Sequence, residues 1–247
     1  HGGPFANIAH GTNSVIATRM ALRLADFVVT ESGFGSDLGA EKFFNIVVRT
    51  GHIPPPDACV LVATLRALKL HGGVKLDKVN EENVEAVEKG FENIQKHTEN
   101  LKTFGVPFVV ALNRFPSDTE VEIKKALDLC RREKVRFALS EVYGKGGKGG
   151  SELAQEVLKA IEEDESRFQF LYPLDMTLLE KIEAVAKKIY GAASVAMEGK
   201  IKRKILRIER EGFGNLPVCI AKTQYSFSDD DEALGRPEDF TLIVTDA

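Results

Sequence analysis

The sequence predicts an α/β protein in which helices cover both faces of a parallel sheet, followed by a smaller α+β unit. Short, continuous apolar runs rich in Val and Ile alternate with helical patterns over the first part of the chain. Such uninterrupted runs are typical of parallel strands that are buried on both faces. Helical patterns dominate after residue 165. We therefore expect one domain at residues 1–165 and a second at residues 166–247, with the boundary between residues 164 and 176.

The first predicted domain alternates strands with helices. Its apolar runs predict strands at residues 27–30, 59–63, 108–112 and 135–139. Turns bearing Gly or Pro lead into helical patterns, which predict helices near residues 37–47, 118–133 and 152–162. Apolar side chains that recur at helical spacing predict a longer helix at residues 81–104.

The second predicted domain mixes helices with short strands. Helical patterns cover residues 178–190 and 200–211, and Gly191 is typical of a helix end. Apolar stretches at residues 217–221 and 242–244 resemble strands.

Composition narrows the class of protein. The 247 residues carry a formal net charge of −4, so there is no electrostatic reason to expect a nucleic-acid or membrane partner. Cys59, Cys130 and Cys219 are odd in number and far apart, which argues against a disulfide framework and favours a reducing, cytoplasmic location. No apolar run approaches a membrane span and no signal peptide leads the chain. Because no initiator Met is present and both ends look cut, we interpret the chain as a fragment.

The first candidate site is the glycine-rich turn at residues 31–39, which follows a predicted strand and opens a helix. Its glycines allow backbone N–H groups to turn toward an anion at the positive end of a helix. A tight strand–helix turn capped by Ser36 or Asp37 explains the same residues without a ligand. Asp37 would repel a bare phosphate, so a functional site here needs a nearby cation or a sugar hydroxyl.

The second candidate site is residues 113–120, at the end of a predicted strand. Ser117 and Glu120 fit a capping box, which explains part of the segment as helix initiation. Phe115 lies beside Asn113 and Arg114 where a planar ligand could stack and form hydrogen bonds. Packing of Phe115 into the core is the alternative.

The third candidate site is the glycine- and lysine-rich loop at residues 140–151. Its glycines before a helix could form an anion-binding nest. The loop is not a Walker A sequence, since that sequence needs Gly-Lys followed by Ser or Thr. For Lys145 and Lys148 taken alone, a flexible solvated loop is the simpler interpretation.

The fourth candidate site is residues 62–73. Arg66 and Lys69 are three residues apart, so one side of a helical turn could carry both. His71 could act as an acid, base or donor, although a His before Gly-Gly is more often a helix C-terminal residue. At the chain start, His1 and His10 have no fixed acidic or thiol partner, so we expect no metal site there.

Together these segments resemble the formate–tetrahydrofolate ligase family, also called formyltetrahydrofolate synthetases, and its bacterial single-function members in particular. The resemblance covers essentially the whole chain, and residues 62–73 are close to a family signature, with Leu65 where Ile or Val is usual. The matching segments are His1–Gly11, Thr30–Phe43, Val62–Gly73, Asn113–Glu120, Ser140–Gly150, Gly212–Pro217 and Ala221–Asp230.

The resemblance implies a fold related to P-loop NTPases and a reaction in which ATP with Mg²⁺ phosphorylates formate. The N10 amine of tetrahydrofolate then attacks formyl phosphate, which gives 10-formyltetrahydrofolate, ADP and phosphate. It also implies activation by a monovalent cation such as potassium or ammonium, and a homotetramer. Phe115 and the aromatic at position 143 are expected to sandwich the pterin, with Leu139 lining the pocket. Tyr143 stands where the family usually has Trp and offers a smaller face.

We assign the remaining site roles as hypotheses. Nucleotide contacts are expected from Gly33, Gly35, Asp37, Gly39, Asn113 and Pro116. Anion or folate-tail contacts are expected from Arg66, Lys69, Lys145 and Lys148. The resemblance places the main catalytic Lys and Arg upstream of His1, so we expect no turnover by this chain alone. It would then act with a companion N-terminal segment or as a homo-oligomer. A noncatalytic folate-binding or subunit-assembly fragment is the alternative, and the missing Walker A sequence argues against a generic P-loop ATPase.

Overall fold

The computed structural model describes residues 5–247, which form two compact units. The sheet unit comprises Pro56–Phe168 and Leu234–Arg236. The terminal unit comprises the chain up to Pro55 together with Gln169–Ala233 and Pro237–Ala247. The chain leaves the sheet unit between residues 168 and 169, whereas residues before Pro56 group with the C-terminal part. The division into domains at 1–165 and 166–247 stays a prediction.

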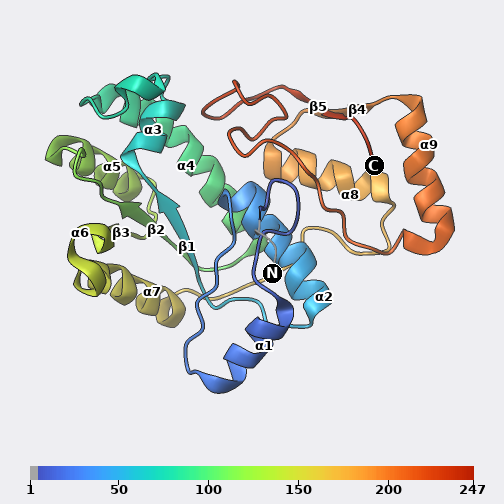
Figure 1. The fold of residues 1–247 in the computed structure, drawn as a ribbon, viewed down its shortest axis with the longest axis horizontal. Coiled ribbons are helices and arrows are strands. Elements are labelled where there is room, and N and C mark those ends of the chain that lie inside the picture. The colour runs from blue at the N-terminus through green and yellow to red at the C-terminus, as the bar shows by residue number, and fades with distance from the viewer. Residues whose placement is uncertain (1–4) are drawn as a thin grey trace. The chain divides into compact units, whose positions relative to one another are not determined.

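The sheet unit is built on three parallel strands in the order β1-β2-β3 (Figure 1). They are β1 (Cys59–Ala63), β2 (Phe108–Asn113) and β3 (Phe137–Ser140). In the central strand the inner four residues are buried, because helices lie on both faces. The register pairs Ala63 with Leu112 and Asn113 with Ser140, so the three carboxyl ends meet at one edge of the sheet.

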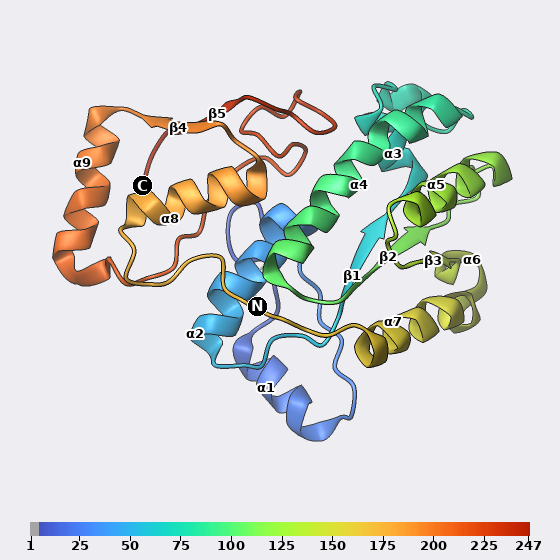
Figure 2. The ribbon, with the colours of Figure 1, turned by 180° about the vertical axis from the view of Figure 1, so that it is seen from behind.

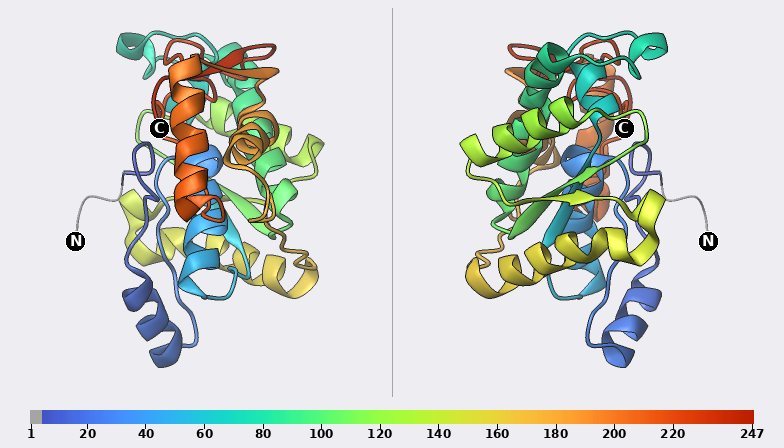
Figure 3. Two further views of the ribbon diagram at one scale, coloured as in Figure 1. Left: turned by 90° about the vertical axis from the view of Figure 1, so that its right-hand side faces the viewer. Right: turned by 90° about the vertical axis from the view of Figure 1, so that its left-hand side faces the viewer.

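Helices cover both faces of this sheet, as predicted (Figure 3). One face packs against α3 (Leu65–His71), α4 (Val84–Phe104) and α5 (Glu120–Arg132), whose apolar side chains share a core with β2. The other face carries α7 (Ser151–Glu163). Three short helical segments complete the unit: η3 (Leu76–Lys78), α6 (Val142–Lys145) and η4 (Gly146–Gly150). The predicted α/β fold class is confirmed.

The terminal unit contains most of the remaining helices and a small parallel sheet of two strands (Figure 2). Its N-terminal part has α1 (Val15–Leu24) and a helical run made of η1 (Gly35–Ala40), η2 (Phe43–Val48) and α2 (Arg49–Gly51). Its C-terminal part has α8 (Leu178–Ala184), η5 (Val185–Tyr190), β4 (Ser194–Met197), α9 (Gly199–Ile208), η6 (Glu209–Phe213) and β5 (Thr241–Val244). Apolar side chains of α8 and α9 pack against both strands.

Two predicted strands do not form. Residues 27–30 belong to no strand, and the side chains of Phe27 and Val29 are exposed, with Val29 at 97%. Residues 217–221 are likewise irregular. Val and Ile content alone does not make a strand, because its backbone N–H and C=O groups need a neighbouring strand to pair with. None of the helices within residues 5–247 is both long and apolar enough for a membrane crossing.

The start of α5 also differs from the prediction. The capping box uses Thr119 and Glu122 instead of Ser117 and Glu120. A turn forms first, in which the Asp118 N–H donates to the Phe115 carbonyl at 3.0 Å. Because this turn must close before the helix begins, the cap moves two residues along the chain.

A buried carboxyl lies inside the terminal unit. Glu41 is 1% exposed, and its carboxylate accepts a hydrogen bond from the Asn45 amide at 2.8 Å. Burial raises the pKa of Glu41 to about 7, although the Asn45 hydrogen bond opposes the shift. The native state therefore binds this proton more tightly than the unfolded chain does.

We expect stability to fall as pH rises from 4.5 to about 7, because ionised Glu41 is disfavoured only in the folded state. Glu41→Gln keeps an acceptor for Asn45 and removes the charge, so it should stabilise the protein at pH 8 by up to about 3 kcal/mol. The gain should vanish near pH 4.5. Urea unfolding at both pH values measures it, with exposed Glu238→Gln as the control. An equal effect of Glu41→Gln at both pH values would contradict this account.

Candidate ligand-binding site

Two aromatic side chains face each other at the carboxyl edge of the parallel sheet. Phe115 follows β2, and Tyr143 lies in α6 just after β3. Their ring centroids are 6.3 Å apart and the ring planes are inclined by 32°. Phe115 is half-buried and Tyr143 is 75% exposed, so neither ring is completely buried in the core. The register of β2 and β3 brings these two predicted residues together. Leu139 on β3 packs against the core of the sheet unit, and its place in a ligand pocket stays a prediction.

The space between the two rings is slightly too small for a flat ligand. A planar ring needs about 3.5–4 Å on each side, so its two walls must stand about 7–8 Å apart. The observed separation of 6.3 Å is therefore about 1 Å short of that range. The missing space would have to come from Tyr143, which is 75% exposed and is followed by Gly144, Gly146 and Gly147, where a β-carbon would meet nothing within 4 Å.

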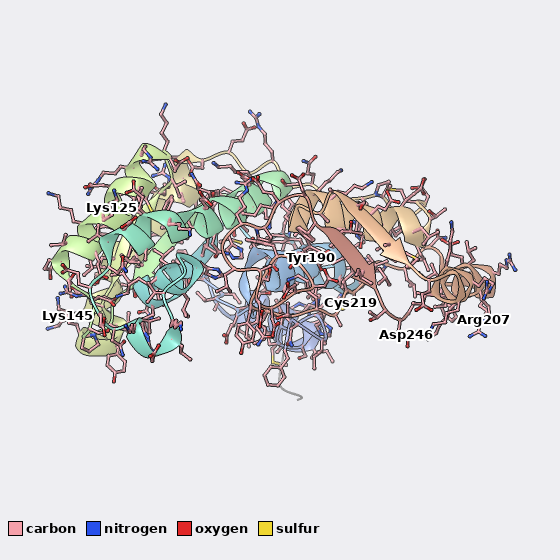
Figure 4. The ribbon with its side chains drawn as sticks, turned by 90° about the horizontal axis from the view of Figure 1, so that it is seen from above. Lys125, Lys145, Tyr190, Arg207, Cys219 and Asp246 are labelled. Atoms are coloured by element: carbon pink, nitrogen blue, oxygen red, sulfur yellow. The ribbon has the colours of Figure 1, made fainter. Side chains whose placement is uncertain are left out.

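A chain of ion pairs connects the two aromatic walls. Arg114, next to Phe115, pairs with both Glu120 and Glu141. Glu141 in turn pairs with Lys145 in the segment that carries Tyr143. The hydrogen bond from Lys145 holds the pKa of Glu141 below its ordinary value. Lys145, which lies at the periphery of the sheet unit (Figure 4), is thus already engaged by a carboxylate.

Gly149 fixes how the glycine-rich loop returns to the sheet. Its carbonyl accepts a hydrogen bond from the Glu141 N–H at 2.9 Å. A β-carbon at position 149 would lie 2.4 Å from the carbonyl carbon of Glu141, a distance that real contacts do not reach. The loop can therefore approach Glu141 only with glycine at this position. Lys148 in the same loop is exposed and makes no ion pair within residues 5–247.

Two acceptor atoms at the end of β2 have no donor. Asp118 is 6% exposed, and one carboxylate oxygen accepts from the Phe115 N–H at 2.8 Å. Its other oxygen, and the side-chain oxygen of Asn113, are buried and accept no hydrogen bond from the described part of the chain. Burial raises the pKa of Asp118, which the Phe115 hydrogen bond only partly offsets. No role was predicted for Asp118, whose only signal in the sequence was its place three residues after Phe115.

Arg66 and Lys69 are in different environments despite their shared helix. Lys69 is completely buried, and its ammonium lies 2.9 Å from the Glu122 carboxylate and 2.9 Å from the Glu81 carbonyl. Burial alone would raise the pKa of Glu122, but hydrogen bonds from Lys69 and two backbone N–H groups hold it below its ordinary value. The predicted folate-tail contact needs an accessible ammonium, which Lys69 does not offer. Arg66 is half-buried and has no ion pair within residues 5–247.

His71 is the last residue of α3, as its position before Gly-Gly suggested. Its Nδ1 accepts a hydrogen bond from the Gly235 N–H at 3.0 Å. That contact ties residues 234–236 to the sheet unit, so we assign His71 a structural role.

In the terminal unit, the predicted nucleotide turn lines a cavity of about 370 Å³. The turn is held by the Gly33 N–H, which donates to the Gly11 carbonyl at 3.0 Å. Gly39 packs directly against this turn. A β-carbon at position 39 would lie 2.1 Å from the Gly33 carbonyl oxygen, so only glycine fits there. The residues that line the cavity are Phe5, Gly11, Glu31, Gly33 and Phe34. No role was predicted from the sequence for Phe5 or Phe34.

Gly35 and Asp37 differ in their exposure to solvent. Gly35 begins the helical run and is exposed, whereas Asp37 is 5% exposed. The Asp37 carboxylate lies 2.9 Å from the ammonium of Lys222, and both side chains are buried. Asp37 therefore pairs with an internal cation in this structure, and its nucleotide contact stays a prediction. Residues 1–4, including His1, lie outside the described residues.

The sheet and the groups beyond its strand ends define a class of protein. A parallel α/β sheet with an aromatic pair and unpaired acceptors at its carboxyl edge is typical of an α/β enzyme that binds a planar ligand there. The family model for formate–tetrahydrofolate ligase matches residues 1–247. The chain belongs to the formate–tetrahydrofolate ligase family.

Lys69 should be essential for stability. Lys69→Met leaves Glu122 charged and buried without a cationic partner, although two backbone N–H groups still donate to it. This change is expected to destabilise the protein by about 3–5 kcal/mol. The double change Lys69→Met with Glu122→Gln should recover much of that loss. Lys125→Met is the control, since Lys125 pairs with Glu88 at the surface (Figure 4) and should cost about 1 kcal/mol or less. Urea unfolding that shows equal effects for both lysines would contradict the assignment.

Gly149→Ala should displace the segment that carries Tyr143, because the new β-carbon meets the Glu141 backbone. We expect weaker tetrahydrofolate binding, with the protein still folded. Gly147→Ala in the same loop has open space and should bind like the parent. Isothermal titration of both variants measures the difference, and equal dissociation constants would show that the loop geometry does not matter.

Proposed function

We propose that this chain provides the tetrahydrofolate slot of an ATP-dependent formate–tetrahydrofolate ligase, with the pterin held between Phe115 and Tyr143. The observation that carries the proposal is the facing pair of rings at 6.3 Å on the carboxyl edge of the sheet. Membership of the ligase family supports the choice of folate over other planar ligands. Stacking positions the N10 amine, while the ring itself takes no part in the chemistry.

The proposed reaction transfers the γ-phosphoryl group of ATP to formate and yields formyl phosphate and ADP. The N10 amine of tetrahydrofolate then attacks the formyl carbon, expels phosphate and loses its proton, which gives 10-formyltetrahydrofolate. Residues 1–247 contain no Gly-Lys-Ser/Thr sequence of the Walker A type. We therefore assign this chain a role in binding and orienting tetrahydrofolate and assign the phosphoryl-transfer groups to no residue of it.

Arg66 and Lys148 are the proposed contacts for the anionic tail of folate. Neither has an ion pair within the described residues, and neither is completely buried. Lys145 can contribute only by sharing its ammonium with Glu141. A glutamate tail carries carboxylates, which a free guanidinium binds in a bidentate manner.

The nucleotide is proposed to enter the cavity in the terminal unit. Exposed Phe34 and Phe5 offer faces for a base. Gly33 lies just before a helical run that begins at Gly35, and the N–H groups at the start of that run favour an anion. Mg²⁺ would then be coordinated mainly by the phosphates of the nucleotide, since it normally binds only one or two protein carboxylates. Glu31 lines the cavity and could supply one. No group of three or more His, Cys, Asp or Glu within residues 5–247 could hold a metal.

In the sheet unit, Asn113 and Pro116 remain proposed nucleotide contacts. The unpaired side-chain oxygen of Asn113 can accept a hydrogen bond from a ligand, and Pro116 is exposed. Activation by a monovalent cation and a homotetramer also remain predictions.

The missing Walker A sequence favours a second candidate, a folate-binding or subunit-assembly module without turnover. Such a module would keep the aromatic slot and lack phosphoryl transfer. Binding of tetrahydrofolate without formation of 10-formyltetrahydrofolate from ATP and formate would support this candidate for the isolated chain. Formation of both 10-formyltetrahydrofolate and ADP would exclude it.

The stacking role is tested by titrating tetrahydrofolate into aromatic variants. Phe115→Ala and Tyr143→Ala should each raise the dissociation constant by roughly 5- to 100-fold, the usual loss for a stacked base. Tyr143→Trp should lower it, because indole offers a larger face. Tyr225→Ala removes another exposed ring and serves as the control. Unchanged binding by both alanine variants would reject the slot.

A further inference from the structure

Asp118 is the most conspicuous unsatisfied group in the sheet unit. Its carboxylate is almost completely buried, yet one oxygen accepts nothing from residues 5–247. Buried polar atoms in native proteins nearly always have a partner, since an unpaired one loses its hydration without compensation. The side-chain oxygen of Asn113, at the end of strand β2, is likewise buried and accepts no hydrogen bond from residues 5–247. Two unpaired acceptors at one strand end indicate that donors arrive from outside the chain.

The geometry ties Asp118 to one wall of the aromatic slot. The paired carboxylate oxygen accepts from the Phe115 N–H at 2.8 Å, and the Asp118 N–H donates back to the Phe115 carbonyl at 3.0 Å. These two bonds fix the carboxylate beside the backbone that positions the Phe115 ring. A ligand stacked on that ring would carry its edge toward this part of the turn.

The electrostatics of Asp118 are consistent with a carboxylate whose hydrogen-bonding capacity is only partly used. Burial raises the pKa of Asp118, and the Phe115 hydrogen bond and the positive charges of Lys69 and Arg114 lower it only in part. The negative charge of Glu122 raises the pKa of Asp118, but Glu122 is itself paired with Lys69. A carboxylate with four lone-pair sites has capacity left after one backbone hydrogen bond.

We propose that Asp118 binds the 2-amino group and N3–H of the tetrahydropterin, and so selects a 2-aminopyrimidinone ring within the Phe115–Tyr143 slot. This inference rests on the proposed folate site. Two parallel N–H groups on one edge of the ring match the acceptor geometry of a carboxylate. Without ligand the slot is about 1 Å too narrow and the oxygen is covered. The inference therefore requires that entry of the ring also exposes this oxygen.

The test compares two ligands on the same protein, tetrahydrofolate and an analogue in which a methyl group replaces the 2-amino group. The unchanged chain should bind tetrahydrofolate at least roughly tenfold more tightly, because the analogue leaves a buried acceptor unpaired. Asp118→Asn keeps an acceptor for the Phe115 N–H but turns an amide donor toward the ligand. It should bind tetrahydrofolate at least roughly tenfold more weakly and lose the preference between the two ligands.

Two controls separate this role from others. Asp128→Asn, on α5 and exposed, should keep the parent's affinity and preference. Tyr143→Ala should lose affinity for both ligands equally and keep the preference, since stacking does not read the amino group. Circular dichroism confirms that each variant is folded.

Each outcome decides between the hypotheses. If the unchanged chain binds both ligands equally, or Asp118→Asn keeps the preference, Asp118 does not read the pterin edge and an internal water satisfies its oxygen. Either result leaves the stacking slot standing. If the unchanged chain binds neither ligand, the folate site itself is rejected together with this inference. Should Asp118→Asn fail to fold, the preference of the unchanged chain still decides, because it needs no variant.

Discussion

The parallel register of β2 and β3 is the constraint on which the site depends. It pairs Asn113 with Ser140, so the segments that leave these two strands start side by side. Phe115 comes two residues after one strand and Tyr143 three residues after the other. A shift of one residue would exchange the faces of a strand and separate the rings. The aromatic slot therefore follows from strand pairing that buried Val and Ala residues determine, far from any ligand.

Burial distinguishes charges that build the protein from charges that serve a ligand. Lys69 and Asp37 were plausible ligand contacts by type and position, yet each is paired inside its own unit with Glu122 or Lys222. Removing a charge from water is costly unless a partner compensates it, so such pairs are committed to the fold. Arg66 and Lys148 have no such ion-pair partner within residues 5–247. Accessibility, more than residue type, decides which cation can meet an anionic substrate.

The sequence predicted the sheet and the stacking pair but missed the features that depend on three-dimensional neighbours. Short apolar runs were enough to predict β1, β2 and β3, although only β2 is buried on both faces and Val60 and Val62 of β1 are exposed. The same composition at residues 27–30 predicted a strand that does not form, since pairing depends on a neighbouring strand. The unpaired oxygen of Asp118 was invisible for a related reason: only coordinates show which donors surround a carboxylate.

In the proposed site the slot is nearly formed, since its two walls are about 1 Å too close to admit a ring. Phe115 is held by the turn to Asp118, whereas Tyr143 sits on an exposed, glycine-rich segment. Such an arrangement would let the Phe115 wall stay fixed while the exposed Tyr143 wall adapts to the ligand.

A crystal structure of the chain with a tetrahydrofolate analogue tests this most directly. The account predicts a pterin between Phe115 and Tyr143, with the ring centroids moved from 6.3 Å to about 7–8 Å apart. A pterin bound elsewhere, with the two rings still at their present separation, would contradict it.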